Sequence, residues 1–324
     1  MILSAPRLKP GVAASLTTLQ MQETWHLQDE NMKRSSSSEG QSASELLSEE
    51  GRSQMSWIGR FATRHPVWFA LAASVTWTAL LLVFMGLASG ALRRPYGDGV
   101  SSAIARLTTT AFVVALVWRL GWLRASGIGR LGGLAVWLLA VGGLAYGVSA
   151  SLYSIYGRVA LDPLVLMRMP AARTTVLAVA VVALGEEVFF RGLVLHSFVR
   201  AWARNRTGVV ASVVLAALLF AALHATQILT NDLSRSAALL LVLQTLVVSV
   251  WWGALVVVGR SIWPAVVLHF AGNAVVAVQG LVTSVAGPGL LAYERNLWLS
   301  IPLGGVGIGL LARVVHRPAP LDAA

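Results

Sequence analysis

One short run of the chain places three charged side chains inside an apolar stretch. The run reads Gly-Glu-Glu-Val-Phe-Phe-Arg-Gly from Gly185 to Gly192, and the apolar residues around it extend from about Val176 to Val199. A charge at the centre of a membrane helix costs about 2.5–3.5 kcal/mol on the insertion scale. Three charges this close together indicate groups that pair with one another or take part in a reaction.

Helix geometry predicts different tasks for the two glutamates of this run. Glu187 and Arg191 lie one turn apart on the same face of a helix, with the acid before the base, which is the more favourable order. Glu186 is rotated by about 100° from Glu187 and has Phe190 one turn ahead of it. We therefore expect Glu187 and Arg191 to neutralise each other and Glu186 to be the reactive carboxylate.

Three more polar side chains lie inside later apolar runs. His224 follows Phe220 by one helical turn, and His269 precedes Asn273 by one turn. Each taken alone is explained by hydrogen bonding between helices, which contributes about 0.6 kcal/mol per bond in membranes. These three side chains and Glu186 nevertheless all lie near the midpoints of their apolar runs. We therefore expect them at a similar depth, around one intramembrane polar cavity.

A carboxylate and imidazoles held together can activate water. Glu186 and a histidine can share the removal of a proton from water, and two further donors can stabilise the oxyanion of a tetrahedral intermediate. An alternative is that Glu186, His224 and His269 bind a divalent metal such as zinc, which would acidify the water. The spacing does not decide between these two mechanisms, so no cofactor is assigned.

Several other classes of site are not favoured. The chain has no cysteine, which excludes disulfides, thiolate metal sites and a cysteine nucleophile. The motif His-Glu-x-x-His of zinc proteases and the motif Gly-x-Ser-x-Gly of serine hydrolases are absent, and no aspartate lies in the middle of an apolar run. The net charge of +11 comes mostly from arginines that stand singly or in pairs between apolar runs, so we expect no nucleic-acid partner.

The polar residues must be positioned by helices that cross a membrane. The chain has 324 residues, is 56% hydrophobic, and repeats apolar runs long enough to span a bilayer. We therefore expect an all-α, polytopic transmembrane bundle with about eight spans. The predicted spans are about 66–91, 101–123, 132–156, 174–199, 208–229, 236–258, 262–283 and 296–315.

Charge and composition also predict the domain organisation and the orientation. Residues 1–55 are polar and too poor in apolar side chains to fold alone, so we expect a disordered segment before a transmembrane domain at 56–318. With the N-terminus inside, 11 arginines fall in cytoplasmic segments and 7 in external ones, which favours both termini in the cytoplasm. The preference for arginine over lysine points to a bacterial source, and hence to a bacterial plasma membrane and its lipids.

Three motifs taken together resemble a known family. Glu-Glu-x-x-x-Arg at 186–191, Phe-x-x-x-His at 220–224 and His-x-x-x-Asn at 269–273 resemble the CAAX-protease and bacteriocin-processing family of intramembrane endopeptidases, and are similar to type II CAAX prenyl endopeptidases. The segment Gly-Arg-Ser-Ile-Trp-Pro-Ala at 259–265 is also similar to that family's pattern. The resemblance covers about residues 170–285, which we interpret as a protease-like core.

The resemblance implies a helical membrane fold with a catalytic cavity, and an intramembrane endopeptidase activity. The implied roles are water activation for Glu186 and His224, oxyanion binding for His269 and Asn273, and support from Glu187 and Arg191. The best-known members remove the last three residues of prenylated CAAX proteins. A bacterial chain has few such substrates, so we expect a membrane-associated or prenyl-like protein or peptide. Members of the family have been described both as metalloproteases and as metal-free glutamate enzymes.

Two other classes of protein are compatible with these motifs. A non-proteolytic member of the family could keep the motifs as a binding cavity and act as a membrane immunity or scaffold protein. A proton-coupled transporter is less favoured, because the two halves of the chain show no convincing internal repeat.

Overall fold

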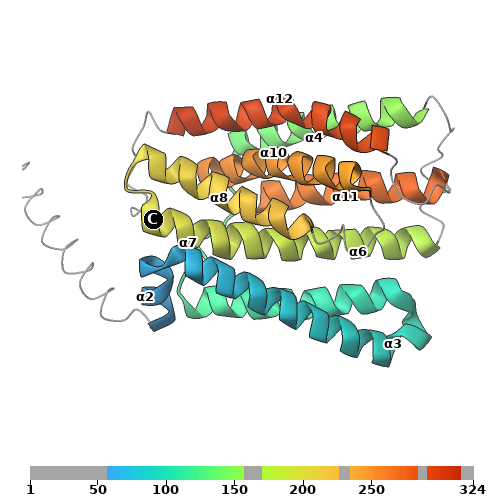
Figure 1. Ribbon diagram of the computed structural model, residues 1–324, viewed down its shortest axis with the longest axis horizontal. Coiled ribbons are helices and arrows are strands. Elements are labelled where there is room, and N and C mark those ends of the chain that lie inside the picture. Colours follow the sequence, from blue (N-terminus) through green and yellow to red (C-terminus); the bar gives the residue numbers. More distant parts are fainter. Residues whose placement is uncertain (1–56, 157–169, 226–233, 284–289, 315–324) are drawn as a thin grey trace, which may run out of the picture. The chain divides into compact units, whose positions relative to one another are not determined.

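The computed structural model describes residues 57–156, 170–225, 234–283 and 290–314 (Figure 1). These residues form helices joined by short connections, and no strand occurs among them. The predicted disorder of residues 1–55 lies outside the described residues. The described elements are α2 (Trp57–Arg64), α3 (Pro66–Arg119), α4 (Leu134–Tyr156), α6 (Pro170–Glu187), the π-helix η1 (Val188–Leu195), α7 (His196–Trp202), α8 (Arg206–His224), α10 (Arg235–Gly259), α11 (Trp263–Thr283) and α12 (Leu290–Val314).

The long helix α3 contributes two apolar stretches, Pro66–Ala91 and Val100–Arg119. The rings of Phe84 and Phe112 stack with centroids 5.7 Å apart. A straight helix would separate these residues by about 40 Å, at 1.5 Å per residue. The chain therefore turns back on itself within α3, as Figure 1 shows. Both stretches can then pack against the segment that carries the tandem glutamates.

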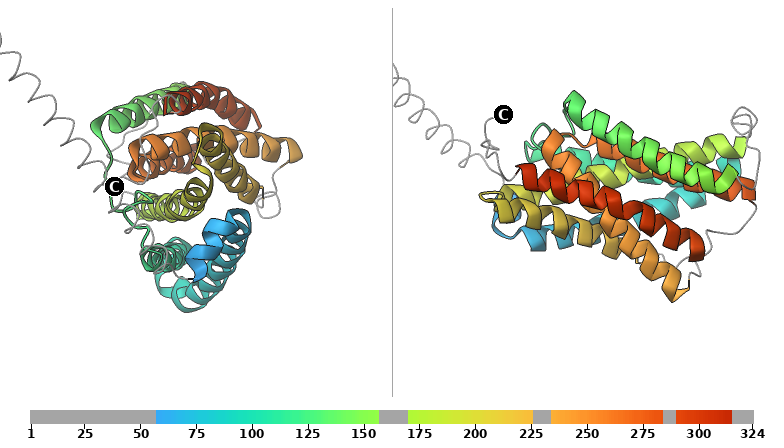
Figure 2. Two further views of the ribbon diagram at one scale, coloured as in Figure 1. Left: turned by 90° about the vertical axis from the view of Figure 1, so that its left-hand side faces the viewer. Right: turned by 90° about the horizontal axis from the view of Figure 1, so that it is seen from above.

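Helix α6, which carries the tandem glutamates, is enclosed by other helices. Helix α6 packs against α3 on one side and against α11 on the other, while α10 packs against α8 and α12 (Figure 2). Apart from Glu187, the largest buried side chains are aromatic or aliphatic, and many belong to η1, α7 and α8. The hydrophobic core therefore surrounds the motif Glu-Glu-x-x-x-Arg.

The motif lies at a change of helix type. Helix α6 ends at Glu187, and the next eight residues form the π-helix η1, all of them buried. The sequence predicted one continuous span here and did not predict the wider turn. Wide turns of this kind are rare and often occur at functional sites. In η1, Phe189 stacks on Trp77 with ring centroids 4.8 Å apart, and Phe190 lies edge-on against Phe220 at 4.7 Å.

The connection between α3 and α4 holds the start of α11 in place. Gly127 has a φ of +84°, and a Cβ at this position would lie 2.8 Å from the Cα of Ser261, so glycine is needed for both reasons. The Ser261 hydroxyl donates to the carbonyl of Arg130 at 2.6 Å, and Trp263 Nε1 donates to the carbonyl of Ile128 at 3.0 Å. These bonds fix the end of α11 from which His269 is presented.

The prediction of an all-α fold with membrane-spanning helices is confirmed, whereas the number of eight spans is not. In the described part of the chain, four stretches are long and apolar enough to cross a membrane, at Pro66–Ala91, Val100–Arg119, Arg206–His224 and Arg235–Gly259. Two shorter apolar helices lie at Leu134–Gly147 and Trp263–Ala277. The remaining spans and the orientation of the termini stay predictions.

Candidate active site

Glu187 is fully enclosed and contacts two basic side chains through one oxygen. Its Oε1 lies 3.1 Å from Nη1 of Arg191 and 2.9 Å from Nδ1 of His269. The side chain of Glu187 has 0% of its surface exposed and that of Arg191 has 2%. The pair of Glu187 and Arg191 expected from the i,i+4 spacing is therefore present. The same carboxylate also contacts α11 through His269.

Arg191 is held by groups from two other helices, α8 and α10. Its Nη2 donates to the hydroxyl of Ser249 on α10 at 2.8 Å. Its Cζ lies 4.6 Å from the ring centroid of Phe220 on α8 and 5.5 Å from that of Trp252 on α10. A guanidinium fits these ring faces and a directed hydrogen bond at the same time. Sequence spacing did not predict these partners, because they come from elements far away in the chain.

Glu186 presents its two oxygens to different neighbours. Its Oε1 lies 3.7 Å from Nη1 of Arg106, which belongs to the second apolar stretch of α3. Its Oε2 lies 3.9 Å from Nε2 of His224 and 3.7 Å from Nε2 of His269. This oxygen is buried and has no hydrogen-bond partner among the described residues. The carboxylate, with 13% of its side chain exposed, thus faces two imidazoles on one side and a guanidinium on the other.

The hydrogen bonds of the two histidines define their tautomers. Nδ1 of His224 lies 3.0 Å from the carbonyl of Phe220, and Nδ1 of His269 lies 2.9 Å from the Glu187 carboxylate. Both partners can only accept, so each Nδ1 carries a proton. In the neutral rings, each Nε2 is then an acceptor facing Glu186. Two imidazole nitrogens and a carboxylate oxygen, all acceptors, match a small donor such as water.

Aromatic rings set the orientation of His269. The ring of Trp252 is nearly parallel to it, with centroids 4.7 Å apart, and Phe220 meets it edge-on at 5.9 Å. His224 in turn lies against Phe220, with centroids 4.5 Å apart. The predicted motif Phe-x-x-x-His therefore places one aromatic ring against both imidazoles, which restricts how far either can rotate.

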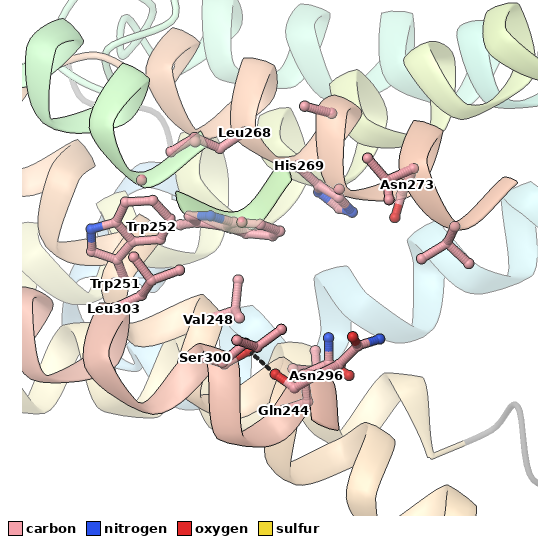
Figure 3. A pocket seen from close by; sticks show the side chains of 18 of the residues that line it. Gln244, Val248, Trp251, Trp252, Leu268, His269, Asn273, Asn296, Ser300 and Leu303 are labelled. Carbon is pink, nitrogen blue, oxygen red and sulfur yellow. Dashed lines mark hydrogen bonds between the residues drawn. The ribbon is translucent and has the colours of Figure 1, made fainter. Parts of the chain in front are cut away.

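Both histidines and Asn273 line a cavity of about 480 Å³ between α4, α6, α8, α10, α11 and α12. Figure 3 shows His269 and Asn273 on one wall, with Gln244, Asn296 and Ser300 across the open space. Among the described residues that line the cavity there is no Asp, Glu, Lys or Arg. The space beside the imidazoles therefore suits an uncharged, largely apolar segment with a few groups that form hydrogen bonds.

The structure brings together most of the residues that the sequence singled out. Glu186, Glu187, His224 and His269 converge within the distances given above, and Asn273 lies on the wall of the adjoining cavity. Arg106 was missed by the sequence analysis, although an arginine inside an apolar stretch was a visible signal.

The donor set does not fit a metal ion as it stands. Among the described residues, no group of three or more His, Cys, Asp or Glu side chains is arranged to hold one. Tetrahedral zinc with nitrogen ligands at 2.0–2.1 Å requires ligand atoms about 3.3 Å apart, whereas both Nε2 atoms are farther than that from Glu186. The metal-dependent alternative is not supported by these residues, and no step below involves a metal.

The carboxylates and imidazoles form a cluster that is enclosed by largely apolar helices. Residues 169–275 match the family model described as type II CAAX prenyl endopeptidase Rce1-like. This match confirms the resemblance indicated by the three motifs and supports a protease at the level of the family, in an integral membrane protein. No curated protein and no solved structure matched the chain. Helix α3, which carries Arg106, lies outside the matched segment.

Proposed function

We propose that this protein is an intramembrane endopeptidase that hydrolyses peptide bonds of membrane-associated protein or peptide substrates with activated water. The observation that carries the proposal is the position of Glu186 Oε2, which is buried, lacks a hydrogen-bond partner in the described part of the chain, and faces both imidazole Nε2 atoms within 4 Å. The family match on the same segment supports a peptide bond as the target.

Water activation would use Glu186 and His224. A water molecule that donates to Glu186 Oε2 and His224 Nε2 has its oxygen lone pairs free to attack a carbonyl carbon. One proton passes to the Glu186 and His224 pair as the new C–O bond forms. When the tetrahedral intermediate collapses, the C–N bond breaks and the same pair returns a proton to the leaving amine. Atoms and charge then balance, and the site is restored.

Oxyanion stabilisation would use His269 and Asn273. The amide of Asn273 can donate in its ordinary form. His269 can donate from Nε2 only when both ring nitrogens carry protons, because its Nδ1–H is already directed at Glu187. The Glu187 carboxylate is then the counter-ion of the imidazolium. The Arg191–Glu187 pair would support catalysis by fixing that carboxylate.

The cavity supports a substrate that is uncharged near the cleaved bond. Its walls are mainly aliphatic and aromatic, and its polar groups are amides, hydroxyls and imidazoles. Such a lining favours an extended segment of a membrane-associated or prenyl-like protein or peptide, rather than a charged soluble peptide. Gln244 and Asn296, which line the cavity across from His269, would donate hydrogen bonds to a peptide backbone (Figure 3).

The test is cleavage by the purified protein in liposomes. Peptide libraries with and without a C-terminal prenyl group would be incubated with wild type and with Glu186→Gln, and products read by mass spectrometry. We expect specific internal cleavage by the wild type, none by the variant, and no change on adding a chelator. Absence of cleavage across all libraries, with a cellular phenotype that survives Glu186→Gln, would instead favour the immunity or scaffold class.

A further inference from the structure

An arginine from outside the family-matched segment lies beside the proposed catalytic carboxylate. Arg106 belongs to the apolar stretch Val100–Arg119 of α3, where a guanidinium is costly unless it has a partner. Its Nη1 lies 3.7 Å from Glu186 Oε1, and its side chain is 25% exposed. Its Nε is buried and has no hydrogen-bond partner among the described residues. The guanidinium is therefore oriented mainly by the charge of Glu186.

The two helices approach closely enough for this contact because residue 185 is glycine. A Cβ at Gly185 would lie 2.7 Å from Oγ1 of Thr110, which stands one helical turn after Arg106 on α3. The Thr110 hydroxyl is itself turned back to the carbonyl of Arg106, at 2.7 Å. The small residue before Glu186 thus lets α3 come near α6 at the level of the carboxylate.

The arrangement gives each of the tandem glutamates its own arginine. Glu187 has Arg191 on the same segment, at 3.1 Å, and Glu186 has Arg106 from α3, at 3.7 Å. Two negative and two positive groups then share the site, and the imidazoles are neutral in the tautomers assigned above. Without Arg106, a carboxylate with only 13% of its side chain exposed would remain without a compensating charge, which is unfavourable in an apolar environment.

We propose that Arg106 is a positioning residue for Glu186, holding Oε1 so that Oε2 faces the imidazoles and the water between them. The terminal torsion of a glutamate is broad and roughly two-fold, so the carboxylate needs an external group to fix its rotation. At 3.7 Å the contact is an ion pair rather than a hydrogen bond. Arg106 therefore orients the carboxylate by electrostatic attraction, and the position of its guanidinium sets the direction of that attraction. The catalytic part of this inference rests on the proposed function, whereas the ion pair does not.

The first test measures kcat and KM separately. Arg106→Met removes the charge and keeps an apolar side chain, Arg106→Lys keeps the charge, and Arg119→Met makes the same change at an exposed arginine at the end of α3. Misplacing a catalytic group by about 1 Å can cost about 100-fold in rate. We expect kcat of Arg106→Met to fall about 100-fold with KM nearly unchanged, partial recovery with Arg106→Lys, and wild-type values for Arg119→Met. Wild-type kcat in Arg106→Met would overturn the proposal.

The second test needs no substrate. Thermal unfolding midpoints would be measured for Arg106→Met, Glu186→Gln and the double variant, and the change in the double variant compared with the sum of the single ones. We expect Arg106→Met to lower the midpoint and the double variant to recover most of the loss. If Arg106→Met does not accumulate, the double variant should. Strictly additive changes, or a double variant as unstable as Arg106→Met, would overturn the ion pair even if the protein cleaves no peptide.

Discussion

Nδ1 of His269 donates to Oε1 of Glu187 at 2.9 Å, across the interface between α6 and α11. The same oxygen lies 3.1 Å from Arg191, so one carboxylate oxygen orients an imidazole and balances a guanidinium. Glu187 therefore decides which nitrogen of His269 faces Glu186. Although it is adjacent to the reactive carboxylate in the sequence, its contacts are those of a structural group, and the two glutamates should respond differently to substitution.

Glu187→Gln should lower the amount of folded protein as well as activity. The amide cannot neutralise Arg191, which is 2% exposed, and removing one partner of a buried pair costs about 3–5 kcal/mol. The double variant Glu187→Gln with Arg191→Met removes the stranded charge and should recover much of the loss. Membrane-inserted protein, quantified beside cleavage, measures both effects. Accumulation of Glu187→Gln at the wild-type level would contradict the structural role.

Glu186→Gln should abolish turnover while leaving the protein level near normal. Glutamine keeps the size of the side chain but cannot accept the proton from water, so we expect a loss of at least about 100-fold in kcat. The Glu186 side chain is partly exposed, and that of Arg106, its partner, is more exposed still. The unpaired arginine left by Glu186→Gln is therefore better solvated than the one left by Glu187→Gln. Normal cleavage by this variant would show that the proposed base is wrong.

Arg191→Lys should not behave as a conservative change. Lysine cannot make the hydrogen bond to Ser249 together with the contacts to the faces of Phe220 and Trp252. We expect a loss of about 1–3 kcal/mol in unfolding free energy, from the buried hydrogen bond and the ring contacts. Arg204→Lys, at an exposed position beyond α7, is the control and should change nothing measurable. Equal unfolding midpoints for the two variants would refute this account of Arg191.

Gly185→Ala should reduce activity by pushing α3 away from α6. Its methyl group would lie 2.7 Å from Thr110 Oγ1, and overpacking of this kind costs about 1–3 kcal/mol. Removing the obstructing oxygen with Thr110→Ala should restore activity in the double variant. Thr110→Ala alone is the control and should stay active. If Gly185→Ala cleaves as the wild type does, the close approach at this position is not needed by the site.

How much of this site the sequence predicts depends on whether a contact is local. The pair of Glu187 and Arg191 follows from helix spacing alone, and the structure contains it. The convergence of Glu186 with the two histidines was inferred from their similar depth along the helices. Depth alone does not bring side chains together, because the rotation and tilt of each helix decide which way they point. Packing between helices determines both. The family match supports the motifs independently of this geometry.

The features that the sequence did not predict arise from packing between distant elements. Ser249 and Trp252 lie on α10, and nothing in their local pattern marks them as partners of Arg191. The π-helix η1 also carries no periodic signal, because its apolar residues are buried on every side. The partner of Arg106 is Glu186 on another helix, so the local sequence around Arg106 does not mark it as part of the site.

The pairing of two glutamates with two arginines has a consequence for how the site responds to an energised membrane. A transmembrane potential acts on net charge, with about 2.3 kcal/mol per elementary charge per 100 mV. Glu186, Glu187, Arg106 and Arg191 sum to zero, and each pair is separated by less than 4 Å, so the potential difference across either pair is small. The voltage across the bilayer therefore does almost no work on this cluster. The charges of these four side chains should therefore add no voltage dependence to the rate of cleavage, unlike the unpaired charges that transport proteins move through the field.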